Sequence, residues 1–257
     1  MKHLFLLTHL VLFTSFCVFA TGGAGTQPSL SDKVSCPHLK YGTPKQSNVV
    51  LCREGYALGY NNTLKSAEWV SYVLNKELGN DVTRQNNFRV DPNIKPKFQT
   101  TPDDYDEPVY HQGHLANSES IDQTQSANDE TFFMSNMTPQ LPGHNTGIWK
   151  GLENRERKWA NKRGRVIVLA GPVYHADILY IGNKVPVPSA YWKVIYDPVK
   201  KEAIAYLIPH KKLKTKQLDN YLVSIDHIEA MYDLDLLSLL EDKLEADIEK
   251  VTQVKQW

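Results

Sequence analysis

The sequence contains few cysteines and no excess of charge of either sign. Three cysteines among 257 residues, with no Cys-x-x-Cys pair, argue against a structural zinc site. The 29 basic residues balance the 29 acidic ones, which argues against a polycationic packaging protein but leaves room for a locally basic cleft. Glycine and proline, at 14 each, are too few for a fibrous or disordered chain. A hydrophobic content of 41% instead fits one globular domain with a sizeable core.

The longest apolar run lies at the N-terminus. Lys2 precedes an almost wholly apolar stretch over residues 4–19, and Val18-Phe19-Ala20 ends in a small residue suited to cleavage. This pattern predicts a signal peptide over residues 1–20. A membrane anchor is the alternative, but the run is shorter than the roughly 20 residues that a spanning helix needs. We therefore expect export to the periplasm or the medium, with no stable membrane association after cleavage.

Cleavage at that position would remove Cys17 and leave two cysteines. An even number in an exported protein favours one disulfide between Cys36 and Cys52, with two free thiols as the alternative. Closing this short loop would stabilise the domain by about 3 kcal/mol. Residues 21–35 are rich in Gly, Ser and Thr and predict a flexible lead-in, so the folded domain is expected over residues 36–257.

Hydrophobic periodicity predicts a mixture of helices and strands. Helical spacing occurs at 66–78 and 148–163, and again at apolar residues between 237 and 251, where an amphipathic helix is expected to pack on the core. Strands are expected at 131–134, 165–170, 191–196 and 203–208, with turns at Gly171-Pro172 and Asp197-Pro198. The prolines and acids of 91–108 predict a surface loop. Without regular βαβ alternation, the pattern indicates an α+β fold.

Three polar segments between residues 110 and 165 carry the side chains that could perform chemistry. The first, YHQGHLAN at 110–117, places His111 and His114 on either side of a glycine that permits close backbone approach. The second is SNMTPQ at 135–140, and the third is NTGIWKGLENRER at 145–157. On a helix, Asn145, Glu153 and Arg157 share one side of the third segment. An amide oxygen suits Mg²⁺, and a guanidinium suits a phosphate.

Each of these side chains also has an ordinary structural interpretation. Glu153 and Arg157 could form an exposed i,i+4 ion pair, and Asn145 could be a helix cap. His114 could be an ordinary surface or core histidine whose hydrogen bonds are satisfied. Trp149, on the same stripe, could stack on a base, although packing is the favoured role. Seven Lys/Arg residues against two Glu between 150 and 165 nevertheless predict a basic surface on a neutral chain.

The order of these segments resembles the DNA/RNA non-specific endonucleases of the ββα-metal type, which include Serratia-type nucleases and mitochondrial endonuclease G. The similarity rests on GH at 113–114, SNMTPQ at 135–140 and HNTGIWKGLENRER at 144–157. It extends to YALGY at 56–60, VLAGPVY at 168–174, VPSAYWKV at 187–194 and VSIDHIE at 223–229. Nearly all of the chain after the signal peptide is covered in family order.

The resemblance implies a ββα-metal domain with a central antiparallel sheet flanked by helices. A hairpin would carry His114 as the general base, and a crossing helix would carry Asn145 as the one direct ligand of a single Mg²⁺ ion, which Mn²⁺ could replace. Glu153 would hold a metal-bound water. Arg157 would offset the charge of the transition state.

The resemblance also implies DNA and RNA as substrates, cut with little regard for sequence to leave 5′-phosphate ends. Candidate substrate contacts are Gln112, Lys150 and Arg157, and contacts to phosphate carry no base information. Since the base must be neutral and an unperturbed histidine has a pKa of about 6.5, we expect activity to fall in acid as His114 protonates. Oligomeric state and the preference among single-stranded DNA, double-stranded DNA and RNA stay open.

The chain departs from the family at two arginines. The usual signature is Asp-Arg-Gly-His, but His111 and Gln112 stand in its first two positions. Asn86 stands where some relatives have another arginine, and Arg84 or Arg89 could replace the lost charge. Two other functions therefore stay open: a non-cleaving nucleic-acid-binding protein of the same fold, and a secreted phosphoesterase that acts on small nucleotides.

Overall fold

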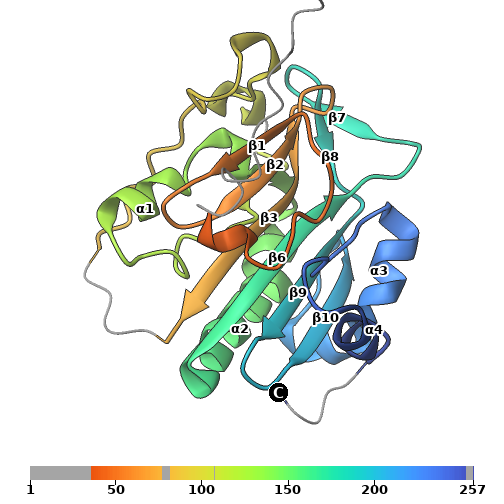
Figure 1. Cartoon of the computed structure of the whole chain (residues 1–257). Helices are drawn as coiled ribbons and strands as arrows, with labels where there is room; N and C mark the ends of the chain where they lie inside the picture. The colour runs from red at the N-terminus through yellow and green to blue at the C-terminus, as the bar shows by residue number, and fades with distance from the viewer. Residues whose placement is uncertain (1–35, 77–81, 107, 253–256) are drawn as a thin grey trace, which may run out of the picture.

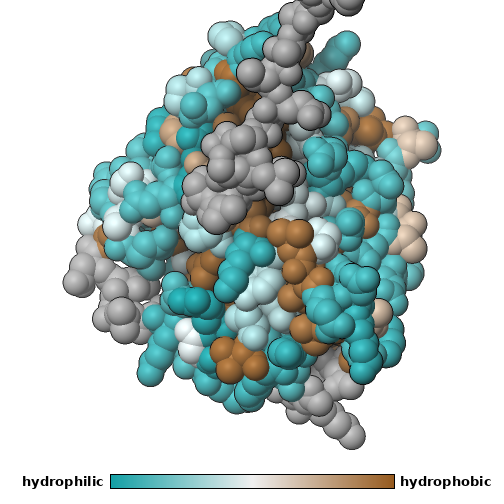
Figure 2. Space-filling view, in the orientation of Figure 1, coloured by the Kyte–Doolittle hydropathy of each residue, from teal (hydrophilic) through white to brown (hydrophobic). Residues whose placement is uncertain are grey.

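The structure is a computed structural model that describes residues 36–76, 82–106, 108–252 and 257. The predicted signal peptide (1–20) and lead-in (21–35) lie outside these residues. Within the described part of the chain, no helix has the length and apolar character needed to cross a membrane. On the face shown in Figure 2, hydrophilic residues predominate and the hydrophobic patches are small.

A seven-stranded sheet forms the centre of the molecule (Figure 1). Its strand order is β1-β2-β3-β6-β9-β10-β11, and every neighbouring pair is antiparallel. The strands are β1 (Val49–Cys52), β2 (Ala57–Asn61), β3 (Ser66–Asn75), β6 (Arg165–Val173), β9 (Ala190–Asp197), β10 (Glu202–Pro209) and β11 (Leu222–Val223). The α+β class and the antiparallel central sheet are therefore confirmed.

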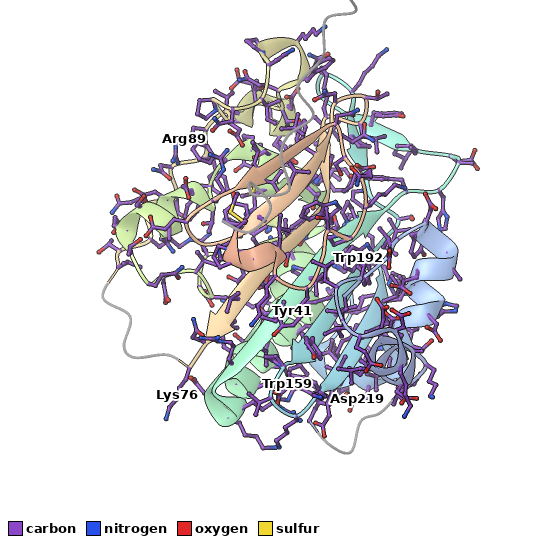
Figure 3. The ribbon with its side chains drawn as sticks, in the orientation of Figure 1. Tyr41, Lys76, Arg89, Trp159, Trp192 and Asp219 are labelled. Carbon is purple, nitrogen blue, oxygen red and sulfur yellow. A yellow bond between two sulfur atoms is a disulfide. The ribbon has the colours of Figure 1, made fainter. Side chains whose placement is uncertain are left out.

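Helices cover both faces of this sheet. Helix α2 (Lys150–Arg163) packs on one face, and α3 (Ile225–Tyr232) and α4 (Asp242–Glu249) pack on the other (Figure 1). Successive side chains of a strand point to opposite faces of the sheet. Val168 of β6 therefore lies in the same hydrophobic cluster as Leu152 of α2, whereas the next residue, Leu169, lies in the cluster that contains Ile228 of α3. Figure 3 shows side chains filling the space on both sides of the sheet.

A two-stranded antiparallel ribbon leads into α2. Its strands are β4 (His111–His114) and β5 (Met137–Gln140), joined by a long connection that contains α1 (Gln125–Glu130). A π-helical turn, His144–Trp149, follows and runs directly into α2. The strand–strand–helix order implied by the resemblance is therefore present.

A second small ribbon pairs β7 (Leu179–Ile181) with β8 (Val185–Val187). Short 3₁₀ helices span Pro37–Leu39, Pro96–Phe98, Pro102–Tyr105, Met134–Asn136 and Thr215–Tyr221.

The helix predicted over 66–78 is wrong, because this segment forms strand β3. The strand lies between β2 and β6 and is buried along most of its length on both faces. A strand buried on both faces carries a continuous apolar run, which matches helical spacing as well as strand spacing. Bulky and β-branched residues such as Trp69, Val70 and Tyr72 favour the strand. The last residues of the predicted helix lie outside the described residues.

Two further local predictions are wrong. The strand expected at 131–134 is instead the end of α1 and the start of a 3₁₀ turn, because both the amide and the hydroxyl of Thr131 donate to the Asn128 carbonyl. Only Phe133 forms an isolated bridge there, to Arg89. The turn expected at Gly171-Pro172 is absent because β6 continues to Val173.

The remaining local predictions agree better with the structure. The strands expected at 165–170, 191–196 and 203–208 and the turn at Asp197-Pro198 are confirmed. The predicted loop at 91–108 contains two 3₁₀ turns and is partly buried rather than wholly on the surface. The C-terminal helix is confirmed but shorter than expected, since α4 spans eight residues.

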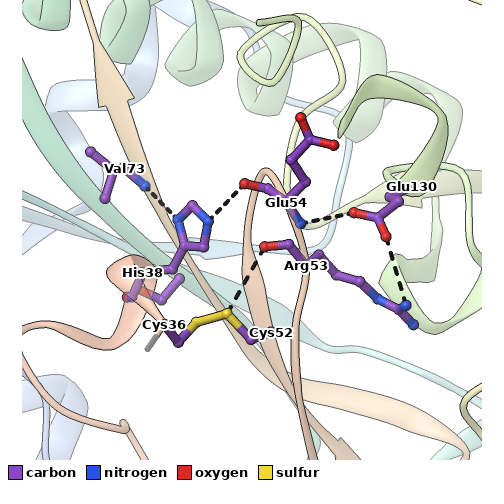
Figure 4. Close-up of a disulfide and its surroundings, with 8 residues drawn as sticks. Cys36, His38, Cys52, Arg53, Glu54, Val73 and Glu130 are labelled. Carbon is purple, nitrogen blue, oxygen red and sulfur yellow. Dashed lines mark hydrogen bonds and ion pairs between the residues drawn. A yellow bond between two sulfur atoms is a disulfide. The ribbon is translucent and has the colours of Figure 1, made fainter. Parts of the chain in front are cut away.

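The predicted disulfide between Cys36 and Cys52 is confirmed (Figure 4). It joins the segment before β1 to the end of β1, across 16 positions of sequence. The imidazole of His38 lies beside it, with Nε2 3.1 Å from the carbonyl oxygen of Glu54 and Nδ1 accepting from the Val73 amide. The disulfide therefore fixes the segment before β1 to the end of β1, and His38 joins the same segment to β3.

Buried ion pairs fix α2 against the sheet. Glu156 of α2 accepts a 2.8 Å bond from Lys193 of β9, and both side chains are fully buried. The Tyr72 hydroxyl of β3 and the Ser120 hydroxyl both donate to the Oε1 atom of Glu156. At the C-terminal end of α2, Arg163 pairs with Asp197 at 2.8 Å. Because a buried charge is tolerated only when paired, these contacts fix the position of the helix.

Candidate active site

The ribbon places the predicted general base beside the turn that precedes α2. Gly113 lies between the two histidines of β4, and a Cβ atom there would lie 2.3 Å from Cδ of Gln140 on β5. Only glycine therefore allows the two strands to pair at this point. The carbonyl oxygen of His114 accepts a 3.3 Å bond from the indole Nε1 of Trp149. This bond joins β4 to the turn His144–Trp149.

The His114 ring lies in an aromatic environment. Its centroid is 5.0 Å from that of Phe132 and 5.8 Å from that of Phe88, both in edge-on contact. Its Nε2 atom is buried and has no hydrogen-bond partner among the described residues. Burial, followed by the nearby charge of Arg84, lowers the pKa of His114 to about 3. The interpretation of His114 as a satisfied histidine does not account for this unpartnered nitrogen, and the lowered pKa favours the neutral ring.

Asn145 lies in the π-helical turn and not at a helix cap. The preceding residue, His144, is buried and stacks on Trp149, with ring centroids 5.8 Å apart, and packs against Tyr191. This anchoring leaves Asn145 partly exposed, with its Nδ2 atom 3.2 Å from Nδ1 of His111. The turn therefore contacts both ends of β4, at His111 through Asn145 and at His114 through Trp149.

Asn145 and His111 line a surface cleft of about 370 Å³. The other lining residues are Arg84, Asn86, Phe88, Tyr105, Tyr110 and Gln112. The amide oxygen of Asn145 and a ring nitrogen of His111 are both ligand types for divalent metals, with oxygen donors favoured by Mg²⁺ and imidazole by transition metals. The donor set present here therefore fits a divalent cation. Gln112, a predicted substrate contact, belongs to the same cleft.

Glu153 lies on the first turn of α2 and is buried. Burial is the main cause that raises its pKa to about 8, and the charge of Lys193 opposes that rise. The alternative of an exposed i,i+4 ion pair with Arg157 is wrong, because Arg157 bonds elsewhere. Its Nη2 atom donates to Glu119 at 2.9 Å and to Asn154, and its Nη1 atom donates to Ser120.

Glu119 is a site residue that sequence reasoning missed. It pairs with Arg157 at 2.9 Å and with Lys150 at 3.6 Å, and both of these residues are predicted to bind phosphate. Lys150 keeps about half of its side chain exposed. No motif or periodicity marks Glu119, because only the folded connection between β4 and α1 brings it to α2. Glu119 and Arg157 line a second cleft of about 360 Å³, together with Val82, Arg84, Ser118, Asp122 and Asn128.

The structure distinguishes the two candidate replacement arginines. The Arg84 guanidinium lies 4.9 Å from the centroid of the Phe132 ring, the same ring that contacts His114. Arg84 also lines both clefts, and its Nε atom donates to the side chain of Asn86 at 2.7 Å. Arg89 instead lies over the Phe133 ring and donates to the Asp129 carbonyl. Of the two, Arg84 is therefore the arginine beside His114.

The basic surface predicted between 150 and 165 is smaller than expected. Arg163 is buried and pairs with Asp197 and Glu202, and Arg155 pairs with Asp219 at 2.6 Å. The exposed basic residues of this stretch are Lys150, Lys158, Lys162 and Arg165. Trp149 is buried, so its favoured packing role is confirmed.

Comparison with known proteins identifies the family. A sequence model of the DNA/RNA non-specific endonuclease family matches residues 35–243. The chain is 31% identical over 250 residues to a nuclease of Serratia marcescens, which covers 89% of this chain and 88% of the relative. It is 30% identical over 240 residues to a nuclease of Nostoc, which covers 86% of this chain and 87% of the relative.

Mitochondrial endonuclease G of Homo sapiens is also similar, at 30% identity over 207 residues, covering 74% of this chain and 69% of the relative. Among solved structures, a complex of EndoG with EndoGI contains a similar chain with a TM-score of 0.76 and 28% identity, covering 80% of this chain and 92% of that one. The fold, the order of the site segments and these similarities agree. The chain belongs to the DNA/RNA non-specific endonuclease family.

Proposed function

We propose that this chain hydrolyses phosphodiester bonds in both DNA and RNA with His114 as the general base and a divalent metal held by Asn145. The observation that carries the proposal is the buried, unpartnered Nε2 atom of a neutral imidazole, on the strand that contacts the Asn145 turn. A neutral imidazole with a free lone pair is the form that a proton-abstracting base requires. The relatives are known as nucleases and endonuclease G, which supports nucleic acid as the substrate.

In the proposed mechanism, His114 Nε2 removes a proton from a water molecule whose oxygen attacks the phosphorus atom. The bond between phosphorus and the 3′ oxygen breaks, and that oxygen gains a proton from solvent. The products carry 5′-phosphate and 3′-hydroxyl ends. Asn145 would hold Mg²⁺ or Mn²⁺ directly and Glu153 would hold it through a water molecule, and the ion would supply Lewis-acid stabilisation of the phosphate and the leaving oxygen. Arg157 and Arg84 offset the negative charge that builds in the transition state.

Substrate binding in this proposal depends on the phosphate backbone. Gln112 lines the same cleft as Asn145. The side chains of Lys150 and Arg157 both pair with Glu119, which holds these two cationic groups in place before a phosphate binds. Contacts of this kind bind any sequence, because phosphates are the same at every nucleotide. This supports cleavage with little regard for sequence.

We also propose that the protein is exported, with residues 1–20 removed as a signal peptide and residues 36–257 forming the nuclease domain. The Cys36–Cys52 disulfide supports this, because disulfides persist in oxidising compartments such as the periplasm and the medium. Fractionation of producing cells and N-terminal sequencing would test the proposal. A mature chain beginning near Thr21 outside the cytoplasm supports it, and an intact N-terminus retained in the cytoplasm contradicts it.

Incubation of purified protein with supercoiled plasmid and with RNA, in Mg²⁺ or in EDTA, tests the activity. We expect the plasmid to be nicked and then linearised only with metal, and both polymers to be degraded. The variants His114→Ala and Asn145→Ala should each lose activity by at least about a thousandfold while remaining folded. His227→Ala is the matched control, because His227 is exposed on α3, on the opposite face of the sheet.

The other outcomes identify the alternatives. An intact plasmid with a salt-sensitive gel shift indicates a non-cleaving binding protein of the same fold. Release of mononucleotides from the start, without linear intermediates, indicates a phosphoesterase that acts on ends or on small nucleotides. Near-parental cleavage by His114→Ala contradicts the assignment of the base.

A further inference from the structure

Three carboxylates meet between α3 and α4, on the face of the sheet opposite α2. Asp226 and Glu229 lie on α3 and Glu249 ends α4, and one oxygen atom of each lies within 4.8 Å of the others. The helices belong to the blue C-terminal part of Figure 1 and pack on β10. Glu249 lies beyond the 35–243 segment that matches the family, so this cluster is not a shared feature of that segment.

The Glu249 side chain has an unsatisfied oxygen. Glu249 is only 7% exposed, and its Oε1 atom has no hydrogen-bond partner among the described residues. One Glu229 oxygen accepts from the Leu236 amide at 2.5 Å, which holds that side chain in the cluster. Since a buried carboxylate oxygen without a partner is costly, the position of Glu249 points to a ligand that satisfies it.

The described surroundings supply more negative charge. Glu245 and Asp235 also act on Glu229 and Glu249, and the buried Oε1 of Glu245 likewise has no partner within the described ranges. Lys250, the nearest base in sequence, pairs with Asp247. Across residues 36–76, 82–106 and 108–252, no ion pair joins a basic side chain to any of the three clustered carboxylates. A cation would relieve this repulsion.

We propose that Asp226, Glu229 and Glu249 bind one Ca²⁺ ion that fastens α4 to α3. Calcium takes six to eight oxygen ligands at about 2.3–2.6 Å, so two ligand atoms on one ion lie up to about 5 Å apart, as these do. Three carboxylates from two helices provide up to six oxygens without nitrogen or sulfur donors, and water can complete the shell. Mg²⁺ fits less well, because it demands a tight octahedron and keeps most of its waters.

The test measures calcium binding apart from the nuclease centre. Asn145→Ala removes the proposed catalytic ligand and serves as the parent for thermal unfolding and calorimetric titration with Ca²⁺. We expect one calcium ion per chain and a rise in Tm of roughly 5–10 °C when calcium is a hundredfold above its Kd. Adding Glu249→Gln should abolish both the titration and the rise, and should not unfold the chain, because it removes a buried charge from a repulsive cluster. Adding Asp242→Asn, an exposed acid on the same helix, should leave both intact.

Three results would overturn the site. The Tm of the Asn145→Ala parent could stay unchanged up to roughly 10 mM Ca²⁺, well above the Kd of weak calcium sites. The variant with Glu249→Gln could retain the full rise. Mg²⁺ could raise the Tm as much as Ca²⁺ does at equal concentration. The nuclease proposal is unaffected by any of these results, because it depends on the other face of the sheet.

Discussion

The Asn145 carboxamide and the His111 imidazole lie 3.2 Å apart although 34 positions separate them in the sequence. His111 stands where the family signature has an aspartate, so an imidazole nitrogen here replaces a carboxylate oxygen beside the proposed metal ligand. Imidazole is a poorer ligand for Mg²⁺ than a carboxylate, and transition metals such as Mn²⁺ accept an imidazole ligand more readily than Mg²⁺ does. The contact therefore bears directly on which metal supports activity.

We predict that His111→Asp shifts metal preference toward Mg²⁺. The ratio of kcat/KM in Mn²⁺ to kcat/KM in Mg²⁺ should fall by on the order of tenfold, because the new carboxylate favours the harder ion. Initial rates of plasmid nicking in saturating concentrations of each metal measure the ratio. Gln112→Asp is the matched control, since it adds the same charge one residue away and keeps the imidazole. An unchanged ratio in His111→Asp would show that His111 does not influence the metal.

Arg84 should contribute to catalysis and Arg89 should not. Arg84 shares the Phe132 ring with His114, whereas Arg89 lies over the neighbouring Phe133 ring. Removing a charged phosphate contact costs about 1–3 kcal/mol, so Arg84→Ala should lower kcat/KM by roughly 5- to 150-fold. Arg89→Ala should stay within about threefold of the parent at matched folded fraction. Equal losses in the two variants would contradict the assignment.

The position of His114 changes the expected dependence on pH. Its pKa is lowered to about 3, chiefly by burial, so the neutral base persists well below the ordinary value of about 6.5. With saturating metal, single-turnover cleavage should therefore change by less than about twofold between pH 7.5 and roughly pH 5.5. A tenfold loss with a midpoint near 6.5 would show that the base titrates as an exposed histidine.

This measurement needs a check that the protein stays folded in acid. The pKa of buried His144 is also lowered to about 3, by burial and then by His210. Below about pH 6.5 the unfolded chain gains protons at His114 and His144 that the folded chain does not, so stability falls as the pH falls toward 3. Circular dichroism at each pH separates this loss from an effect on the base.

Much of the site could be predicted because its motifs are local. The Gly113-His114 and Asn145 segments carry the family pattern, and the structure brings β4 and the turn before α2 together through Trp149. The strands at 165–170 and 191–196 could also be predicted, because short apolar runs rich in valine and aromatic residues favour buried strands. The segment at 66–78 could not, because its apolar positions satisfy both helical and strand spacing.

The long-range parts of the site could not be predicted at all. Arg84 contacts the Phe132 ring and Arg89 contacts the adjacent Phe133 ring, and adjacent residues can point in opposite directions. Glu119 becomes a partner of Arg157 only after the connection between β4 and α1 folds against α2. Sequence spacing holds no information about such contacts until the fold is known.

The buried side chains of Lys193 and Glu156 should stabilise the fold only when both charges are present. Lys193→Met leaves the Glu156 carboxylate buried with neutral donors alone, Tyr72 and Ser120, and should cost about 3–5 kcal/mol of unfolding free energy. Adding Glu156→Gln should recover more than half of that loss, because the amide oxygen still accepts from both hydroxyls. Urea unfolding of the two single variants and the double variant completes the cycle.

The same cycle tests whether the pair supports the active site. The Lys193 ammonium lies 4.5 Å from the centroid of the Trp149 ring, whose indole donates to the His114 carbonyl. If this packing helps to hold β4, the double variant should regain stability while its kcat/KM stays several-fold below that of the parent. Losses that simply add in the double variant would mean that the two charges do not depend on each other, and that α2 is fixed by its apolar face alone.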